Sequence, residues 1–262
     1  MDLLSCRILN ALQDGFPLVH APFLELGNQL GISGQECLLR VKKMKDDGLI
    51  REIGAVFDAR RLGYQSTLVA MKIEPSRLRE AAAVVNRHPG VSHNYERKDD
   101  FNLWFTLAVP SAEDLEAAVL GLHEAAGSLR TLNLPALKVY KIGVRFRFSE
   151  EGVKSVSEAG AGSPVKMAAS PLPPEDVGFV RAFQEEFPLV LNPYRAIAEK
   201  NSIREEALFE KAREMREKGC LRRVGALIDH RKAGFTENIL AVWQVPDESL
   251  MKWGENWPIS RK

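Results

Sequence analysis

An internal repeat constrains the fold of this chain more than any other feature. The segment 16–75 aligns without a gap on 187–246, an offset of 171 residues, and sixteen of the aligned positions are identical. The densest match joins Gly54-Ala-x-x-Asp58 in the first copy to Gly225-Ala-x-x-Asp229 in the second. Because repeated sequence units fold into repeated structural units, both copies should begin with the same domain.

Local signals predict a helix-turn-helix domain at the start of each copy. Apolar residues follow helical spacing over 3–12, Pro22 opens a second helix, and Ser33 is placed to cap a third helix that stops at Gly48. Three short helices with a glycine-containing turn before the third are typical of this motif. The segment 50–57 that follows should form a β-wing.

After Tyr64 the pattern changes to alternating strands and helices. The expected elements are strand 66–73, helix 77–87, strands 91–97 and 102–109, helix 113–126 and strand 137–148. This βαββαβ order is the ferredoxin-like unit, so the fold class is α+β, with the second copy incomplete.

The first copy is predicted to contain a helix-turn-helix domain at 1–63 and a ferredoxin-like domain at 64–148, followed by a flexible linker at 149–174. The second copy is predicted to contain a helix-turn-helix domain at 175–234 and the truncated start of a ferredoxin-like domain at 235–262, which includes one strand at 239–245. The linker is rich in Ser, Gly, Ala, Glu and Pro and has no aromatic residue, so it should not bury enough apolar surface to order itself.

Composition narrows the function classes. The 36 basic and 35 acidic side chains leave a net charge of +1, whereas proteins that hold DNA mainly by charge are usually more basic. The cysteines Cys6, Cys37 and Cys220 share no short spacing, which predicts buried thiols in a reducing cytoplasm and no metal site. With neither a signal peptide nor a long apolar run, we expect no membrane association.

Four separated motifs carry a family resemblance. They are Arg51-x-x-Gly54-Ala-Val-Phe-Asp58-x-Arg60-Arg-x-Gly63-Tyr64, then Gly90-Val-Ser-His93-Asn-Tyr95-Glu-Arg97, then Asn102-Leu-Trp-Phe105, then Leu134-Pro135 with Tyr140-Lys141-Ile142. The domain layout resembles Lrp/AsnC transcription regulators, and the motifs resemble the siroheme decarboxylases within that group.

The resemblance implies that two acetate side chains of siroheme lose CO₂ to give didecarboxysiroheme, on a route to heme or heme d1. Siroheme is then the substrate, and no external cofactor is implied. Such enzymes consist of two homologous subunits that are sometimes fused, and this chain resembles a fusion with a shortened second half. We therefore expect a homodimer or a separate homologous subunit as partner.

Alternation along 91–97 places His93, Tyr95 and Arg97 on one strand face. Three donors on one face suit a flat polyanionic ligand. Decarboxylation leaves a carbanion that must be protonated, and imidazole changes charge near neutral pH, so His93 is the first candidate for the acid and Tyr95 the next. The resemblance also puts His93 and Arg97 in the family's site. The alternative is an exposed sheet face with incidental polar residues.

The remaining substrate-binding candidates are Arg51, Arg60, Lys141 and Trp104. Arg51 and Arg60 would form a carboxylate-binding rim near the wing, since guanidinium binds carboxylates in bidentate geometry. Alternatively, they and Asp58 are a requirement of the fold. Lys141 fits either a pocket wall or a solvated strand face.

The main rival function is a DNA-binding regulator. The candidate recognition helix at 204–218 holds five basic and five acidic residues, and Glu205, Glu206 and Glu210 would be repelled by phosphates. Two unequal recognition helices also fit symmetric half-sites poorly. A third class is an inactive interaction subunit. We therefore expect DNA not to be a partner.

Overall fold

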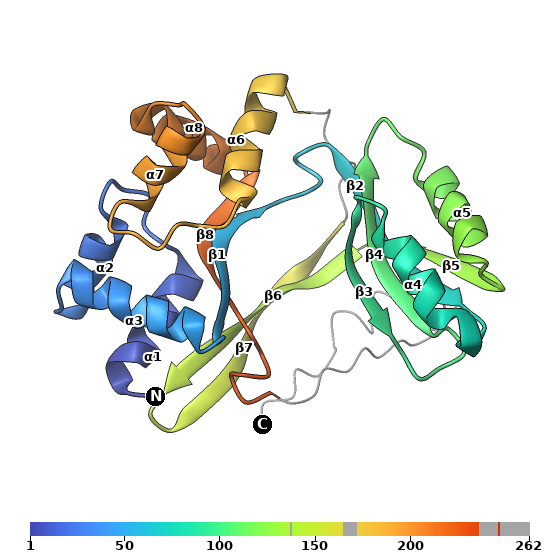
Figure 1. Cartoon of the computed structure of the whole chain (residues 1–262), viewed down its shortest axis with the longest axis horizontal. Helices are drawn as coiled ribbons and strands as arrows, with labels where there is room; N and C mark the ends of the chain where they lie inside the picture. The colour runs from blue at the N-terminus through green and yellow to red at the C-terminus, as the bar shows by residue number, and fades with distance from the viewer. Residues whose placement is uncertain (137, 165–171, 236–245, 247–262) are drawn as a thin grey trace. The chain divides into compact units, whose positions relative to one another are not determined.

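The computed structural model describes residues 1–136, 138–164, 172–235 and 246 (Figure 1). The chain divides into two compact units, each of which is described by itself. One unit contains Met1–Asp58, Tyr140–Gly162 and the chain from Pro173 onward, and the other contains Ala59–Val139 with Ser163–Leu172.

The first unit holds two matching sets of elements, blue and orange in Figure 1. The first set is α1 (Leu3–Asp14), α2 (Pro22–Leu30), α3 (Gly34–Asp46) and β1 (Ile50–Phe57), and the second is α6 (Pro174–Gln184), α7 (Pro193–Lys200), α8 (Glu205–Glu217) and β8 (Leu221–Ile228). Every element of the second set begins 171 residues after its counterpart. The duplication is thus confirmed, and it extends to α1 and α6, ahead of Phe16.

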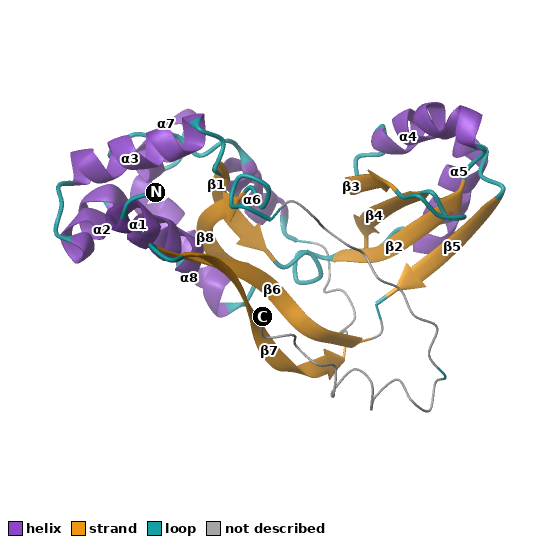
Figure 2. Cartoon of the chain, turned by 90° about the horizontal axis from the view of Figure 1, so that it is seen from below, coloured by secondary structure: helices purple, strands orange, loops and turns teal. Residues whose placement is uncertain are grey.

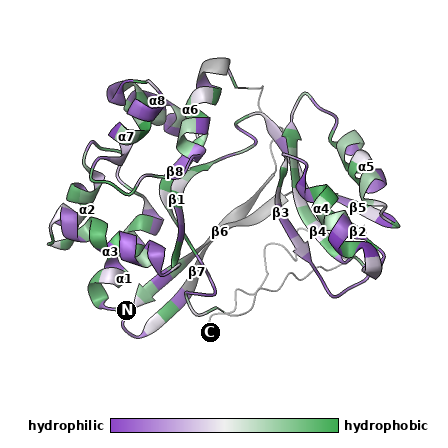
Figure 3. Cartoon of the chain, viewed as in Figure 1, coloured by the Kyte–Doolittle hydropathy of each residue, from purple (hydrophilic) through white to green (hydrophobic). Residues whose placement is uncertain are grey.

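The helix boundaries follow from local capping chemistry. The Ser33 hydroxyl accepts a hydrogen bond of 3.1 Å from the backbone N–H of Glu36 at the start of α3. Pro22 opens α2, and Gly31 ends it with a φ of 74°, a conformation that favours glycine. Figure 3 shows apolar and polar stretches alternating along α2 and α3, as expected for helices with one buried face.

The two copies meet around a local two-fold relationship. Strands β1 and β8 pair antiparallel, with Gly54 opposite its repeat equivalent Gly225. The N–H of Asp58 donates to the carbonyl of Cys220 at 2.8 Å, and the N–H of Asp229 donates to that of Leu49 at 3.0 Å. Each predicted wing therefore uses the wing of the other copy as its partner strand.

An aromatic cluster lies at the same junction. The rings of Phe16 and Phe187, which are repeat equivalents, have centroids 5.3 Å apart. Phe16 contacts Phe23 at 5.0 Å, and Phe187 contacts Tyr194 at 5.4 Å, so each copy repeats the same edge-on pair. All four rings are buried, which makes the junction of the two copies a hydrophobic core.

The predicted linker is wrong over Gly152–Pro164. Strand β6 (Lys138–Ser149) turns back into β7 (Gly152–Pro164), and the two form a two-stranded sheet. Antiparallel pairing is made by backbone hydrogen bonds, so it does not require the apolar side chains that this segment lacks. The hairpin is tied to α1, where the Gln13 side chain donates to the carbonyl of Phe146 at 2.7 Å and accepts from its N–H at 3.0 Å.

The second unit is the ferredoxin-like domain. Its elements are β2 (Tyr64–Lys72), η1 (Pro75–Arg77), α4 (Leu78–Asn86), β3 (Val91–Glu96), β4 (Leu103–Pro110), α5 (Leu115–Ala126) and β5 (Arg130–Pro135). The antiparallel sheet has the order β3-β4-β2-β5, and α4 and α5 cover one face of it (Figure 2). Val69, Phe105 and Leu122 are among the residues of the core between sheet and helices.

The strand expected at 137–148 is present as β6, but the prediction that it completes this sheet is wrong, because β5 at Arg130–Pro135 takes that place. The alternation of apolar and polar residues in β5 is a weak strand signal, because Leu132 and Leu134 lie on the sheet face away from the helices. Their ladder partners on β2 are Ala70 and Leu68. The stronger alternation after residue 137 belongs to β6, which pairs with β7. The predicted strand at 239–245 lies outside the described residues.

Candidate functional site

Strand β3 forms one edge of the sheet and begins with an irregularity. Val91 pairs with Leu107, but the register shifts before His93, which pairs with Thr106. Ser92 is the extra residue of this bulge, and both Ser92 and His93 are exposed. Gly90 comes just before the bulge, where a Cβ atom would collide with the carbonyl oxygen of Ala108, so the backbones can approach only without a side chain.

Beyond the bulge, three side chains form a row on the exposed face of β3. The rings of His93 and Tyr95 stack with centroids 6.2 Å apart and planes inclined by 27°. The Arg97 guanidinium lies over the Tyr95 ring, 4.9 Å from its centroid. The prediction that these three residues share one face is confirmed.

Trp104 of β4 belongs to the same face, because it lies directly opposite Tyr95 in the ladder. Its indole N–H donates to the carbonyl of Phe101 at 2.6 Å, which fixes the ring. In β4 the alternate residues Phe105 and Leu107 are buried under the helices, so Trp104 and Thr106 point to the face that no helix of this unit covers. This open face presents imidazole, phenol, guanidinium and indole groups together.

These groups form a chemically coherent set. The indole ring of Trp104 offers stacking surface to a planar molecule, while the Arg97 guanidinium offers N–H donors to a carboxylate. The imidazole and phenol add groups that can transfer protons. Tyr95 is 46% exposed, so the row is accessible.

The other predicted residues lie elsewhere in the chain. Arg51 belongs to β1 in the first unit, whereas Arg60 lies in the turn between β1 and β2, where its carbonyl accepts from the N–H of Gly63 at 3.0 Å. Lys141 belongs to β6, and its side chain lies outside the described part. The structure therefore brings together His93, Tyr95, Arg97 and Trp104, and it assigns Arg51 and Lys141 to the other unit.

The equivalent arginines of the two copies differ in their partners. Arg222 of β8 forms an ion pair with Asp58 of the first copy at 2.8 Å. Arg51 is its repeat equivalent and is exposed, and among the described residues no ion pair reaches its guanidinium. Asp229, the equivalent of Asp58, instead accepts from the backbone N–H groups of Arg231 and Lys232, which lowers the pKa of its carboxyl group. Asp58 thus has a structural role, because it joins the first copy to Arg222 of the second.

Sequence reasoning missed Ser92. Strict alternation places it on the face opposite His93, but the bulge turns it outward, and its hydroxyl oxygen lies 3.0 Å from Nδ1 of His93. The bulge has a weak sequence signal in Gly90, since glycine often marks a close backbone approach next to a strand.

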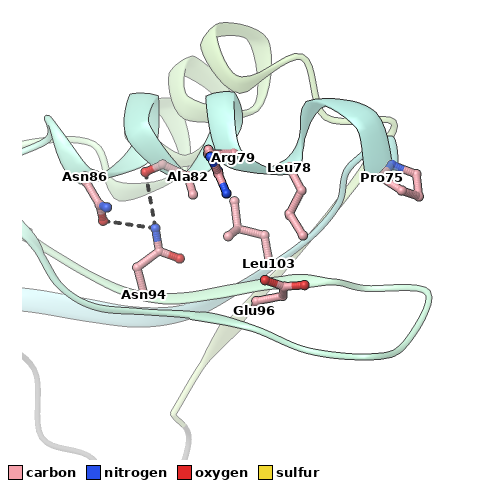
Figure 4. Close-up of a pocket in the computed structure, with 8 residues that line it drawn as sticks. All are labelled: Pro75, Leu78, Arg79, Ala82, Asn86, Asn94, Glu96 and Leu103. Atoms are coloured by element: carbon pink, nitrogen blue, oxygen red, sulfur yellow. Dashed lines mark hydrogen bonds between the residues drawn. The ribbon is translucent and has the colours of Figure 1, made fainter.

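A separate groove lies on the helix-covered side of β3 (Figure 4). It has a volume of about 390 Å³ and is lined by Pro75, Leu78, Arg79, Ala82, Asn86, Asn94, Glu96 and Leu103. The Asn94 amide donates to the side-chain oxygen of Asn86 at 3.0 Å. None of the predicted site residues lines this groove, so it is distinct from the His93–Tyr95–Arg97 row.

Several cations of the candidate recognition helices are held by acidic side chains. In α3, Arg40 is bound by Asp2 at 2.7 Å and by Glu36 at 3.1 Å. In α8, Lys211 forms ion pairs with Asp176 and Glu214, and hydrogen bonds from Lys211 and Lys218 lower the pKa of Glu214 to about 2. Cations neutralised in this way are poor ligands for DNA phosphates.

Two structural features are absent from the described residues. No helix in them combines the length and the apolar character needed to cross a membrane. Likewise, these residues contain no group of three or more His, Cys, Asp or Glu side chains placed to hold a metal ion.

Family models match both kinds of domain. The model described as the siroheme decarboxylase NirDL-like HTH domain matches residues 5–51 and again residues 179–222, one match in each copy. The model described as the AsnC-like ligand binding domain matches residues 61–141.

Relatives match across both copies. The chain is 38% identical over 249 residues to "Siroheme decarboxylase" of Hydrogenobacter thermophilus, covering 95% of this chain and 73% of that protein. It is 30% identical to "Siroheme decarboxylase NirDL subunit" of Paracoccus denitrificans, covering 95% of this chain and 74% of that protein. The crystal structure of the siroheme decarboxylase NirDL in co-complex with an iron-uroporphyrin III analogue superposes with a TM-score of 0.71 at 33% identity, covering 95% of this chain and 71% of that one. The chain therefore belongs to the siroheme decarboxylase family.

Proposed function

We propose that this chain acts on siroheme as a carbon–carbon lyase, which decarboxylates two acetate side chains to methyl groups and gives didecarboxysiroheme for heme or heme d1 synthesis. In each decarboxylation a C–C bond breaks and CO₂ leaves. The electron pair stays on the methylene carbon beside the macrocycle. This carbon then takes up one proton and becomes a methyl group. The change consumes a proton and needs no external oxidant or reductant.

The observation that carries the proposal is the stacked row of His93, Tyr95 and Arg97. Arg97 binds a substrate carboxylate through its paired N–H groups and orients the acetate to be lost. His93 delivers the proton to the carbon after CO₂ has left, with Tyr95 as a second donor beside it. Trp104 stacks against the macrocycle.

The further carboxylates of siroheme need further cations, and we assign this role to Arg51, Arg60 and Lys141. The exposed Arg51 guanidinium, in contrast to that of Arg222, is available for a ligand carboxylate. A group fixed in a structural ion pair would have to break that pair before it could bind substrate.

We also propose that the open face of the sheet is covered in the assembled enzyme by a second copy or by a homologous subunit. Leu68, Leu132 and Leu134 contribute apolar surface to this face, and apolar surface of this kind favours association. Relatives matched over part of this chain are named as subunits, such as the siroheme decarboxylase alpha subunit of Desulfovibrio desulfuricans, 44% identical over 151 residues. If a second copy covers the face, light scattering should give at least twice the monomer mass. A chain that stays a monodisperse monomer at micromolar concentration, both alone and when mixed with a homologous subunit, would contradict the proposal.

The test of function is anaerobic incubation of the purified chain with siroheme, followed by mass analysis of the tetrapyrrole. The expected product has lost two CO₂, and protein denatured before mixing is the control. Siroheme recovered unchanged, although bound by folded protein, would contradict the proposed activity. The regulator alternative is tested in parallel, since it requires salt-dependent DNA binding.

A further inference from the structure

We propose that Ser92 is a positioning residue, which holds the proton on Nδ1 of His93 so that Nε2 is the nitrogen that delivers a proton to the substrate. The proposal rests on the proposed function of His93. Its physical content is a fixed tautomer and a fixed ring orientation, which can be measured without any substrate.

The backbone of β3 brings Ser92 and His93 to the same side of the strand. In a regular strand, consecutive residues point to opposite faces, so Ser92 and His93 would be on different sides of β3. The register shift between Val91 and His93 removes that separation. Both side chains are exposed, and the Ser92 hydroxyl lies 3.0 Å from Nδ1 of His93.

The contacts of the His93 imidazole leave one of its two nitrogens open. Among the described residues, Ser92 is the one hydrogen-bond partner of the His93 imidazole. Tyr95 stacks on the ring and so restricts its tilt without bonding to either nitrogen. Nδ1 is therefore occupied by the protein, whereas Nε2 remains available to a ligand on the open face.

Proton delivery uses Nε2 and leaves the proton on Nδ1 in place. An imidazolium ring carries one proton on each nitrogen, and the Nδ1–H donates to the Ser92 oxygen. When Nε2 gives its proton to the carbanion, the ring that remains is the neutral tautomer with its proton still on Nδ1. Nε2 then takes up a proton from water for the second decarboxylation, and the ring does not need to turn over. Ser92 thus keeps the same nitrogen directed at the substrate in both steps.

The test uses the whole chain with labelled histidine. Long-range ¹⁵N–¹H NMR spectra, recorded where His93 is neutral, should show the proton on Nδ1 in the wild type. Ser92→Ala should shift His93 toward the Nε2–H tautomer that predominates in free histidine, whereas Ser92→Thr keeps a hydroxyl and should retain the wild-type tautomer. Thr106 lies directly opposite His93, so Thr106→Val, which removes a neighbouring hydroxyl, is the matched control and should leave the tautomer unchanged.

Turnover supplies the second readout. Ser92→Ala should lower kcat by about tenfold, the equivalent of one ordinary hydrogen bond, with KM nearly unchanged and with recovery in Ser92→Thr. A wild-type His93 with its proton on Nε2, or a Ser92→Ala variant with the wild-type tautomer, would overturn the proposal even in an active enzyme. If the wild type shows the Nδ1–H tautomer but releases no CO₂ from siroheme, the proposed function fails while the role of Ser92 in holding the ring stands.

Discussion

Gly54 lies directly opposite Gly225 in the ladder of β1 and β8, and the two glycines occupy the same position in the two copies. Their surroundings nevertheless differ. A Cβ on Gly225 would meet the backbone oxygen of Leu12 at 2.6 Å, whereas a Cβ on Gly54 would meet only the Glu52 side chain, at 3.3 Å. Helix α1 thus approaches β8 closely, and a methyl group has no room there.

The two glycines provide a matched pair of variants. Gly225→Ala should destabilise the chain by about 1–3 kcal/mol, because the backbone of α1 must move to relieve the overlap. Gly54→Ala should cost much less, since the Glu52 side chain can rotate away. Urea unfolding curves of the two variants measure the difference. Equal losses would show that α1 does not rest on Gly225.

Phe23 and Tyr194 are repeat equivalents in the aromatic cluster, but only Tyr194 carries a hydroxyl. That hydroxyl is buried without a hydrogen-bond partner among the described residues, and burial raises the pKa of Tyr194. We expect Tyr194→Phe to stabilise the chain by about 1 kcal/mol, because it removes an unsatisfied buried group. The reverse change, Phe23→Tyr, should destabilise it.

Burial of Tyr194 also makes the folding stability of the chain depend on pH. Because the pKa of Tyr194 is higher in the folded state, the folded chain favours the neutral phenol. The contribution of this residue to folding stability is therefore complete below pH 10, which is about the pKa of tyrosine in the unfolded chain. The contribution is lost as pH rises above that value. Thermal melts between pH 8 and 11 should therefore fall less steeply for Tyr194→Phe than for the wild type, and parallel curves would rule this explanation out.

Local signals predicted the helix-turn-helix domains well, because capping and turn residues such as Ser33 and Gly31 act over a few positions. The bounds of β1 were also predicted correctly, but not its partner, since pairing of Gly54 with Gly225 joins segments far apart in the chain. The hairpin of β6 and β7 could not be predicted from side-chain composition, because backbone groups make it. In the candidate site, alternation correctly grouped His93, Tyr95 and Arg97.

Arg51 and Arg222 should separate binding from stability. Arg51→Ala is expected to weaken siroheme binding with an unchanged melting temperature, because no described residue forms an ion pair with it. Arg222→Ala breaks the contact with Asp58, which is partly exposed, so the stability loss should stay below about 1 kcal/mol while binding is retained. Titration with siroheme and thermal melts of both variants provide the measurements. If Arg222→Ala weakened siroheme binding while Arg51→Ala retained it, the carboxylate-binding rim would lie on the second copy.

Arg97 should act through both its charge and its planar shape. Arg97→Ala should weaken siroheme binding by about 1.5–3 kcal/mol, the value of a charge-assisted hydrogen bond. Arg97→Lys restores the charge but not the planar stack on Tyr95, so it should recover only part of the affinity. Lys98→Ala, one residue outside the row, is the control. An unchanged affinity in Arg97→Ala would remove Arg97 from the site.

His93 should affect turnover far more than binding. His93→Ala and His93→Gln should both take up siroheme with a spectrum close to that of the wild type, because Arg97 and Trp104 remain to hold it. Neither replacement can supply the imidazole proton, so CO₂ release should fall by about 10²–10⁴-fold, the usual contribution of a general acid. His123 is a control, because it bonds to Thr131 at 2.9 Å and lies on α5, which covers the opposite face of the sheet.

The combination of readouts separates three roles for His93. Slow turnover with intact binding and an unchanged melting temperature supports the acid. Poor binding together with early melting in both variants would make His93 a structural residue of β3. A strongly shifted siroheme spectrum with intact binding would make it a ligand of the iron. Normal turnover in both variants would move the acid elsewhere, and Tyr95, stacked 6.2 Å away, is the next group in the row to replace.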